Sequence, residues 1–76
     1  MNDVRSKLVD IFVSVFEVPE SDVSSIEYQS VPAWDSIGHM LMISEIETIF
    51  SISIDMNDVI EISNFDQCVD KVNKYL

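Results

Sequence analysis

Positive charge is nearly absent from the middle of this chain. Of 76 residues, 14 are Asp or Glu and only 4 are Lys or Arg, which gives a formal net charge of −10. No Lys or Arg lies between Lys7 and Lys71. Nucleic acids and anionic lipid surfaces are bound mainly through Lys and Arg, so the composition excludes both as partners. The acidic surface favours basic patches on partner proteins, or it serves solubility alone.

The chain has only one Gly, two Pro and one Cys. So few turn formers predict long regular elements, and helices fit better than a sheet of many strands. The lone Cys68 cannot form an internal disulfide, and its place on the apolar side of a predicted helix indicates a buried, inert thiol. There is no signal peptide and no apolar run long enough to span a membrane. We therefore expect a single, monomeric domain over residues 1–76 in a reducing cytoplasm.

Hydrophobic periodicity predicts an all-α fold with three longer helices and one short helix. The longer helices are expected at 3–16, at 36–50 and from residue 65 onward, and the short one at 56–61. The first stripe contains Val4, Leu8, Ile11, Phe12, Val15 and Phe16, and the last contains Phe65, Cys68, Val69, Val72, Tyr75 and Leu76. Ser63-Asn64-Phe65-Asp66 looks like a capping box that starts the last helix.

Two connections complete the predicted layout. Residues 17–35 form a long acidic connection, which is unusual in so small a domain and invites a functional explanation. Its apolar residues are expected to pin it to the core; they are Val23, Ile26, Tyr28 and Val31. Residues 51–55 alternate like a strand but have no partner strand, so we expect an extended linker with Ile52 and Ile54 turned inward.

The helix at 36–50 has two apolar faces. A helical wheel places Met42, Ile43, Ile46, Ile49 and Phe50 on one face, with His39 near it, and this is the predicted core stripe. Ile37 and Leu41, with Met40 at the edge, point largely the other way. Exposed apolar residues at this spacing indicate a contact surface, or else the long connection covers them.

Several candidate sites are weak. Asp55-Met56-Asn57-Asp58 resembles the start of a calcium loop but lacks the required Gly at the sixth position and Glu at the twelfth. His39 is the only histidine and has no paired Cys, so it indicates a partly buried structural residue rather than a metal ligand. Ser36 and His39 are three residues apart on one short helix and point in different directions, which argues against a catalytic triad.

Ser36 is the strongest candidate. It stands at the predicted start of a helix, after an acid and before an apolar residue, in Trp34-Asp35-Ser36-Ile37-Gly38. The amino end of a helix offers unpaired N–H groups and the positive end of the helix dipole, so a phosphate-linked group is stabilised there. The alternative is that Ser36 is only a helix cap, because Ser and Asp are both favoured caps.

The chain resembles the acyl carrier proteins over essentially its full length. The family's Asp-Ser-Leu motif appears as Asp35-Ser36-Ile37. The end of its second helix appears as Glu45, Glu47 and Phe50, and its following Ile-x-Ile appears as Ile52 and Ile54. The resemblance implies a small four-helix bundle with a long first loop. It implies no enzyme activity, but a carrier that enzymes act on.

In such a carrier, the Ser36 hydroxyl bears a 4′-phosphopantetheine arm that a phosphopantetheinyl transferase attaches from coenzyme A, which makes the chain a phosphoprotein. The arm holds an acyl or aminoacyl group as a thioester for biosynthetic enzymes. Asp35 helps to position the transferase and its metal. The resemblance makes the second helix the main docking surface, with Ile37 as an apolar contact and Glu45 and Glu47 meeting basic residues of the loading and transferring enzymes.

Two positions depart from the fatty-acid carriers, which often have acids where this chain has Gly38 and Leu41. The docking surface, which also includes Met40, is therefore more apolar, and a dedicated biosynthetic pathway is favoured over primary fatty-acid synthesis. The competing hypothesis is a helical module that binds a basic partner without covalent modification, with Ser36 only a helix cap.

Overall fold

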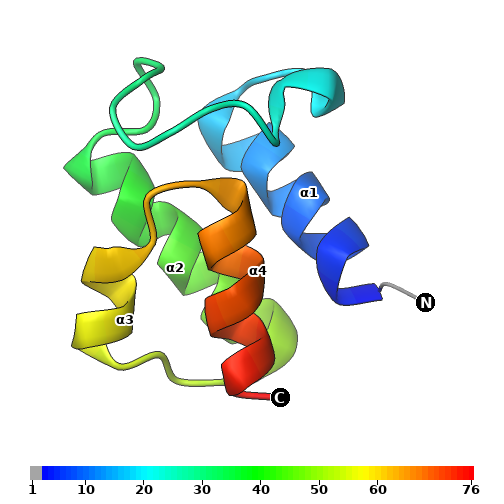
Figure 1. The fold of residues 1–76 in the computed structure, drawn as a ribbon, viewed down its shortest axis with the longest axis vertical. Helices are drawn as coiled ribbons and strands as arrows, with labels where there is room; N and C mark the ends of the chain where they lie inside the picture. The colour runs from blue at the N-terminus through cyan, green and yellow to red at the C-terminus, as the bar shows by residue number, and fades with distance from the viewer. Residues whose placement is uncertain (1–2) are drawn as a thin grey trace.

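The computed structural model describes residues 3–76 and is all-α over that range. Its helices are α1 (Asp3–Phe16), α2 (Ser36–Phe50), α3 (Met56–Glu61) and α4 (Phe65–Lys74), with a 3-10 turn, η1, at Glu20–Asp22. The three longer helices pack into a bundle, and the short α3 lies beside the lower part of α4 (Figure 1). The predicted fold class is confirmed, and each predicted helix is present.

No helix within residues 3–76 is long and apolar enough to cross a membrane.

Aromatic side chains from three segments form the centre of the core. Phe12 of α1 makes edge-on contacts with Phe16, Trp34 and Phe65, at ring-centroid separations of 5.2, 5.3 and 5.1 Å. Trp34 stacks on Phe16 at 4.5 Å and is completely buried. Trp34 belongs to the long connection, so this connection contributes a side chain to the core, as the helices do.

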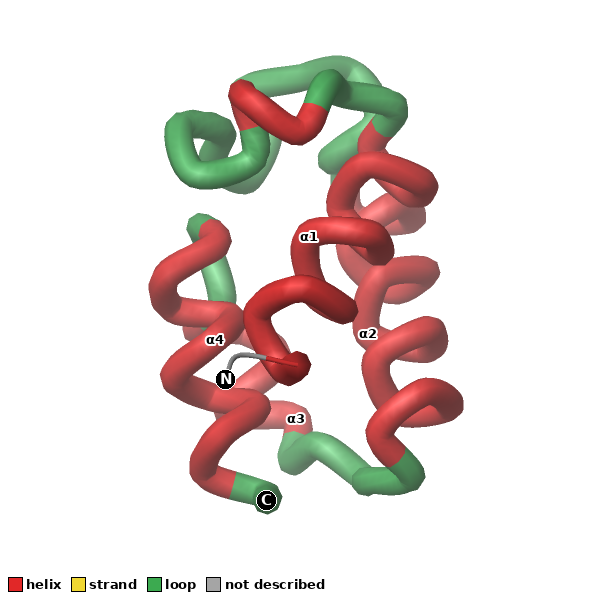
Figure 2. The backbone as a smooth tube through the Cα atoms, turned by 90° about the vertical axis from the view of Figure 1, so that its right-hand side faces the viewer, coloured by secondary structure: helices red, strands yellow, loops and turns green. Residues whose placement is uncertain are grey.

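The connection 17–35 closes one end of the bundle (Figure 2). Its residues Val23 and Ile26 are buried, as predicted, and Val31 is half-buried. The backbone of Tyr28 donates a hydrogen bond to the carbonyl of Ser63 at 2.9 Å, which ties the connection to the segment before α4. Tyr28 itself remains 37 % exposed, so it pins the connection less than predicted.

Two apolar residues assigned to the core lie at its edge instead. Ile49 is 43 % exposed because it sits at the side of the buried α2 stripe, which centres on Met42 and Ile46. Leu76 is 61 % exposed because α4 ends at Lys74, so the last residues leave the helical face. Neither displacement changes the architecture.

The helix ends show how a chain with one glycine terminates its helices. Glu17 and Ser51 follow α1 and α2 in the left-handed region, with φ of 57° and 56°, where glycine is normally preferred. At the start of α4, Asn64 is the cap and accepts from the Gln67 amide at 2.9 Å. The expected capping box at Ser63 and Asp66 is therefore shifted by one residue.

Candidate functional site

Ser36 is the first residue of α2, and Asp35 is the cap. Asp35 Oδ1 accepts from the Gly38 amide at 2.8 Å, and the Asp35 carbonyl accepts from the His39 amide at 2.8 Å. Ser36 is exposed, and no hydrogen bond within residues 3–76 involves its hydroxyl. The suggestion that Ser36 only caps the helix is therefore wrong, because its neighbour does so.

Gly38 sets how closely α2 approaches the connection before it. It is buried in the first turn of α2, and a Cβ at this position would overlap the carbonyl oxygen of Ala33. Only a residue without a side chain allows this close approach. This packing explains why position 38 holds Gly rather than an acidic residue, and Gly38 is not part of the exposed surface.

His39 links three parts of the molecule from the first turn of α2. Its Nδ1 accepts from the indole N–H of Trp34 at 3.0 Å, and its Nε2 donates to the carbonyl of Val59 at 2.8 Å. The ring is 9 % exposed. Both nitrogens are engaged when the proton is on Nε2, so His39 is the structural residue that was predicted. It is not free to act as a base toward Ser36.

An apolar groove of about 270 Å³ lies between the start of α2 and α3, and Ser36 is part of its wall. Its other lining residues come from α2, α3 and the two neighbouring connections; they are Tyr28, His39, Met40, Met56, Val59, Ile60, Ile62 and Ser63. Ser36 therefore lies beside a space suited to an apolar group. The contribution of α3 to this groove was not predicted, because nothing local in the sequence of a six-residue helix indicates what it faces.

The predicted docking residues divide into two groups. Ile37, Met40 and Leu41 are 71, 47 and 55 % exposed, so the connection does not cover them. Glu45 is exposed as well. Glu47 is turned toward the linker, where its Oε2 accepts from the Ile54 amide at 2.8 Å. Its carboxylate therefore has a structural task that the sequence did not reveal.

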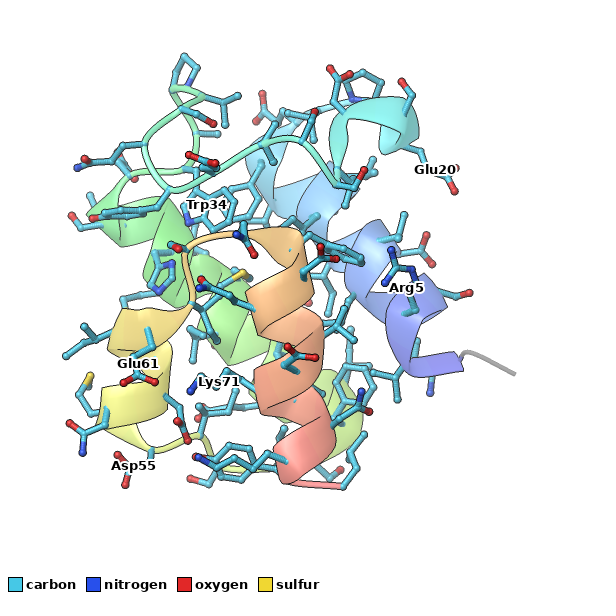
Figure 3. All side chains as sticks on the ribbon, in the orientation of Figure 1. Arg5, Glu20, Trp34, Asp55, Glu61 and Lys71 are labelled. Carbon is cyan, nitrogen blue, oxygen red and sulfur yellow. The ribbon has the colours of Figure 1, made fainter. Side chains whose placement is uncertain are left out.

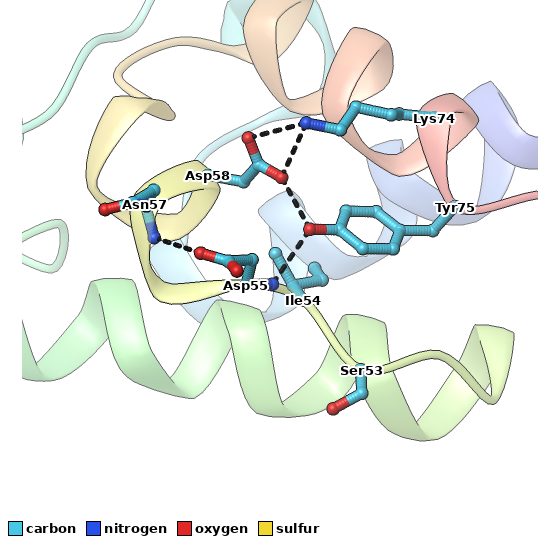
Figure 4. A pocket seen from close by; sticks show the side chains of 7 residues that line it. All are labelled: Ser53, Ile54, Asp55, Asn57, Asp58, Lys74 and Tyr75. Carbon is cyan, nitrogen blue, oxygen red and sulfur yellow. Dashed lines mark hydrogen bonds and ion pairs between the residues drawn. The ribbon is translucent and has the colours of Figure 1, made fainter.

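A polar cluster joins α3 to the last residues of the chain. It consists of Asp58, Lys71, Lys74 and Tyr75, and we call it the Asp58 clasp (Figure 4). Asp58, only 5 % exposed, is paired with Lys74 Nζ at 2.9 Å and with Lys71 Nζ at 3.2 Å, and it accepts from the Tyr75 hydroxyl. The Tyr75 hydroxyl in turn accepts from the Asp55 amide at 2.8 Å. Lys71 also pairs with Glu61, toward which it points in Figure 3.

These contacts shift the ionisation of the clasp. The Tyr75 hydroxyl first, and then Lys74, hold the pKa of Asp58 well below its usual range. The bond to Asp58 raises the pKa of Tyr75, and Glu61 followed by Asp58 raises the pKa of Lys71. The charged carboxylate and the protonated partners are therefore favoured in the folded state.

The described residues offer little for metal binding or thiol chemistry. They contain no group of three His, Cys, Asp or Glu side chains that could hold a metal ion. Asp55, the first residue of the segment that resembles the start of a calcium loop, caps α3 by accepting from the Asn57 amide at 2.8 Å. Cys68 is fully buried, as predicted, and burial raises its pKa to about 12, so the thiol is inert.

No protein-family model matches this chain, and no curated protein or solved structure is significantly similar to it.

Proposed function

We propose that this protein is a covalent carrier that holds an acyl or aminoacyl group as a thioester on a 4′-phosphopantetheine arm attached to Ser36. The observation that carries the proposal is the exposed Ser36 hydroxyl, which begins α2, takes no part in capping and lies beside an apolar groove. The resemblance of Asp35-Ser36-Ile37 to the acyl carrier motif supports the same assignment.

The surroundings of Ser36 fit a phosphodiester and an apolar cargo. The first amides of α2 and its dipole favour negative charge at this end of the helix. Asp35 is exposed, and its cap bond uses only one carboxylate oxygen. The other oxygen can therefore meet the metal of a transferase beside Ser36. The groove provides apolar surface next to the attachment point. When bound, the arm supplies a thiol that carries the acyl group.

The partners we propose are a phosphopantetheinyl transferase and the enzymes that load and transfer the acyl group in the cytoplasm. Tethering gives the thioester a high effective concentration at each docked enzyme. Weak complexes steered by charge exchange rapidly, and a net charge of −10 suits partners with basic patches. Ile37, Met40 and Leu41 are the proposed apolar contacts, and Glu45 is the proposed acidic contact. Glu47 contributes less, because its carboxylate holds the linker.

The test is intact mass after incubation with coenzyme A and a broad-specificity transferase. The wild-type chain should gain the mass of one arm, and Ser36→Ala should gain none. Ser44→Ala is the matched control, because Ser44 is an exposed serine on the same helix. A wild-type chain that stays unmodified, or a Ser36→Ala chain that gains the arm, would contradict the assignment.

The second candidate is a module that binds a partner without covalent modification. The exposed apolar residues of α2 favour it, because they need no arm to form a contact surface. The two functions differ in the behaviour of Ser36→Ala. A carrier loses acyl transfer with this change, whereas a non-covalent module keeps its partner affinity and loses it with Ile37→Ala.

A further inference from the structure

The start of α2 is tied to the connection before it through two buried side chains. The Trp34 indole N–H donates to His39 Nδ1 at 3.0 Å, and the two rings are stacked with a centroid separation of 6.2 Å. Trp34 is completely buried and His39 is 9 % exposed. Ser36 lies between these two residues in the chain, so their hydrogen bond closes the segment 34–39 around it.

The backbone on both sides of Ser36 is held as well. The carbonyl of Trp34 accepts from the Gln29 amide at 2.8 Å, and the carbonyl of Asp35 accepts from the His39 amide at 2.8 Å. The Ser36 side chain is exposed and takes part in none of these bonds. The hydroxyl is therefore presented to solvent from a segment whose flanking residues are fixed.

A fixed helix start matters because helix ends fray. The first amides of an α-helix have no partners within the helix, and the end turns open more easily than the middle. Ser36 is the first residue of α2, so its hydroxyl would move with any such opening. His39 opposes this movement, because its Nε2 donates to the Val59 carbonyl at 2.8 Å while its Nδ1 holds Trp34. The first turn of α2 is therefore connected to α3 and to the connection 17–35 at once.

We propose that Trp34 and His39 form a brace that positions the Ser36 hydroxyl for transfer of the arm, with His39 as a positioning residue. This inference rests on the proposed function. In the transfer, the Ser36 oxygen forms a bond to the phosphorus next to pantetheine, and the pyrophosphate bond of coenzyme A breaks. The nucleotide leaves with the other phosphate, and the transferase accepts the serine proton. A nucleophile misplaced by about 1 Å loses rate on the order of 10²-fold, so holding Ser36 in place raises the rate of the chemical step.

The brace differs in position from the proposed docking contacts. Ile37 and Leu41 are 71 and 55 % exposed, whereas both residues of the brace are buried. A docked enzyme therefore covers the first pair, and the brace acts from inside the fold. Loss of the brace should lower kcat of the transferase for this chain, whereas Ile37→Ala should raise KM.

The experiment measures kcat and KM of a broad-specificity transferase with coenzyme A and the variants His39→Asn and His39→Gln. Asn places an amide oxygen near the position of Nδ1, so it keeps an acceptor for Trp34 and loses the bond to Val59. Gln places an amide nitrogen near the position of Nε2, so it keeps the bond to Val59 and loses the acceptor. We expect kcat to fall ~10-fold or more for His39→Gln and to stay within about twofold of wild type for His39→Asn, with KM unchanged. Trp34→Phe, which removes the donor, should behave like His39→Gln.

Val72→Ala is the matched control for stability, because Val72 is completely buried in α4 and lies outside the brace. It should lower the free energy of unfolding and leave kcat unchanged. All rates are measured at a temperature where circular dichroism shows each variant to be folded. Equal kcat values for His39→Asn and His39→Gln, or an equal loss in Val72→Ala, would overturn the brace and leave Ser36 as the arm site. A wild-type chain that takes no arm would instead contradict the proposed function and this inference together.

Backbone order parameters from NMR relaxation give a second measurement that needs no transferase. In the wild type, the Ser36 amide should be as ordered as the middle of α2, with a value of about 0.85. The value at Ser36 should fall in Trp34→Phe, while the middle of α2 keeps its own. An unchanged value at Ser36 in Trp34→Phe would refute the brace, even where a His39 variant does not fold.

Discussion

Replacement of His39 by Leu should destabilise the protein well beyond the loss of one side chain. His39 accepts from the Trp34 indole at 3.0 Å and donates to the Val59 carbonyl at 2.8 Å, and it is 9 % exposed. Leu has a similar bulk but neither acceptor nor donor. The Trp34 N–H, on a completely buried side chain, would then have no partner.

The magnitude follows from the two bonds. A buried donor left unsatisfied costs about 1–3 kcal/mol, and an ordinary hydrogen bond contributes about 0.5–1.5 kcal/mol. The Val59 carbonyl also accepts from the Ile62 amide at 3.4 Å, so it keeps one partner when the bond from His39 is lost. The cost of losing that bond therefore lies at the lower end of the range for an ordinary hydrogen bond. We therefore expect the free energy of unfolding to fall by about 2–4 kcal/mol. This is a large fraction of the total for a chain of this size, because the free energy of unfolding is typically ~0.05–0.15 kcal/mol per residue. At about 4–8 °C per kcal/mol, Tm should fall by at least ~8 °C.

The assay is urea and thermal unfolding of His39→Leu, His39→Asn, Trp34→Phe and the double variant Trp34→Phe/His39→Leu. The Asn side chain places an amide oxygen near the position of Nδ1, so it should recover part of the loss. In the double variant, the unsatisfied donor is gone, and the total loss should be smaller than the sum of the single losses by about 1 kcal/mol or more. Additive losses, or a Tm for His39→Leu within ~2 °C of the wild type, would refute this reasoning.

Three further outcomes are expected. Gly38→Ala should destabilise by about 1–3 kcal/mol in urea unfolding, because its Cβ overlaps the Ala33 carbonyl; a neutral result would show that the backbone yields there. Ser51→Gly should stabilise the protein by about 0.5–1 kcal/mol. The left-handed φ of 56° costs a residue with a side chain roughly 1–2 kcal/mol, and the larger loss of backbone entropy by Gly on folding offsets part of this gain; destabilisation would contradict this. The Tyr75 hydroxyl and Lys74 lower the pKa of Asp58, so its ionised form stabilises the fold above the ordinary Asp pKa of about 4; this contribution shrinks as pH falls below that value and is lost only below the lowered pKa of the folded state. Wild type should therefore exceed Asp58→Asn in unfolding free energy at pH 7, and the gap should narrow steadily as pH falls below about 4; a gap independent of pH would argue against it.

Local patterns along the chain were sufficient for the helices and for one side of the candidate site. Apolar spacing of 3.6 residues predicted the bounds of α1, α2 and α3 as the structure has them. The same spacing predicted that Ile37 and Leu41 face away from the core, and Ser36 was expected at a helix start. These features depend only on residues within a few turns of one another.

The sequence by itself determined an acidic, all-α chain with Asp35 and Ser36 at the start of α2, because charge, periodicity and helix boundaries are local properties. Only the tertiary structure decided that Asp35 rather than Ser36 makes the cap bond, and that Glu47 turns inward to the linker. It alone brought His39 to Val59 and Asp58 to Lys74, residues separated by 20 and 16 positions. Such contacts depend on how helices cross and how connections close over them, and this follows from packing of the whole core rather than from any one segment.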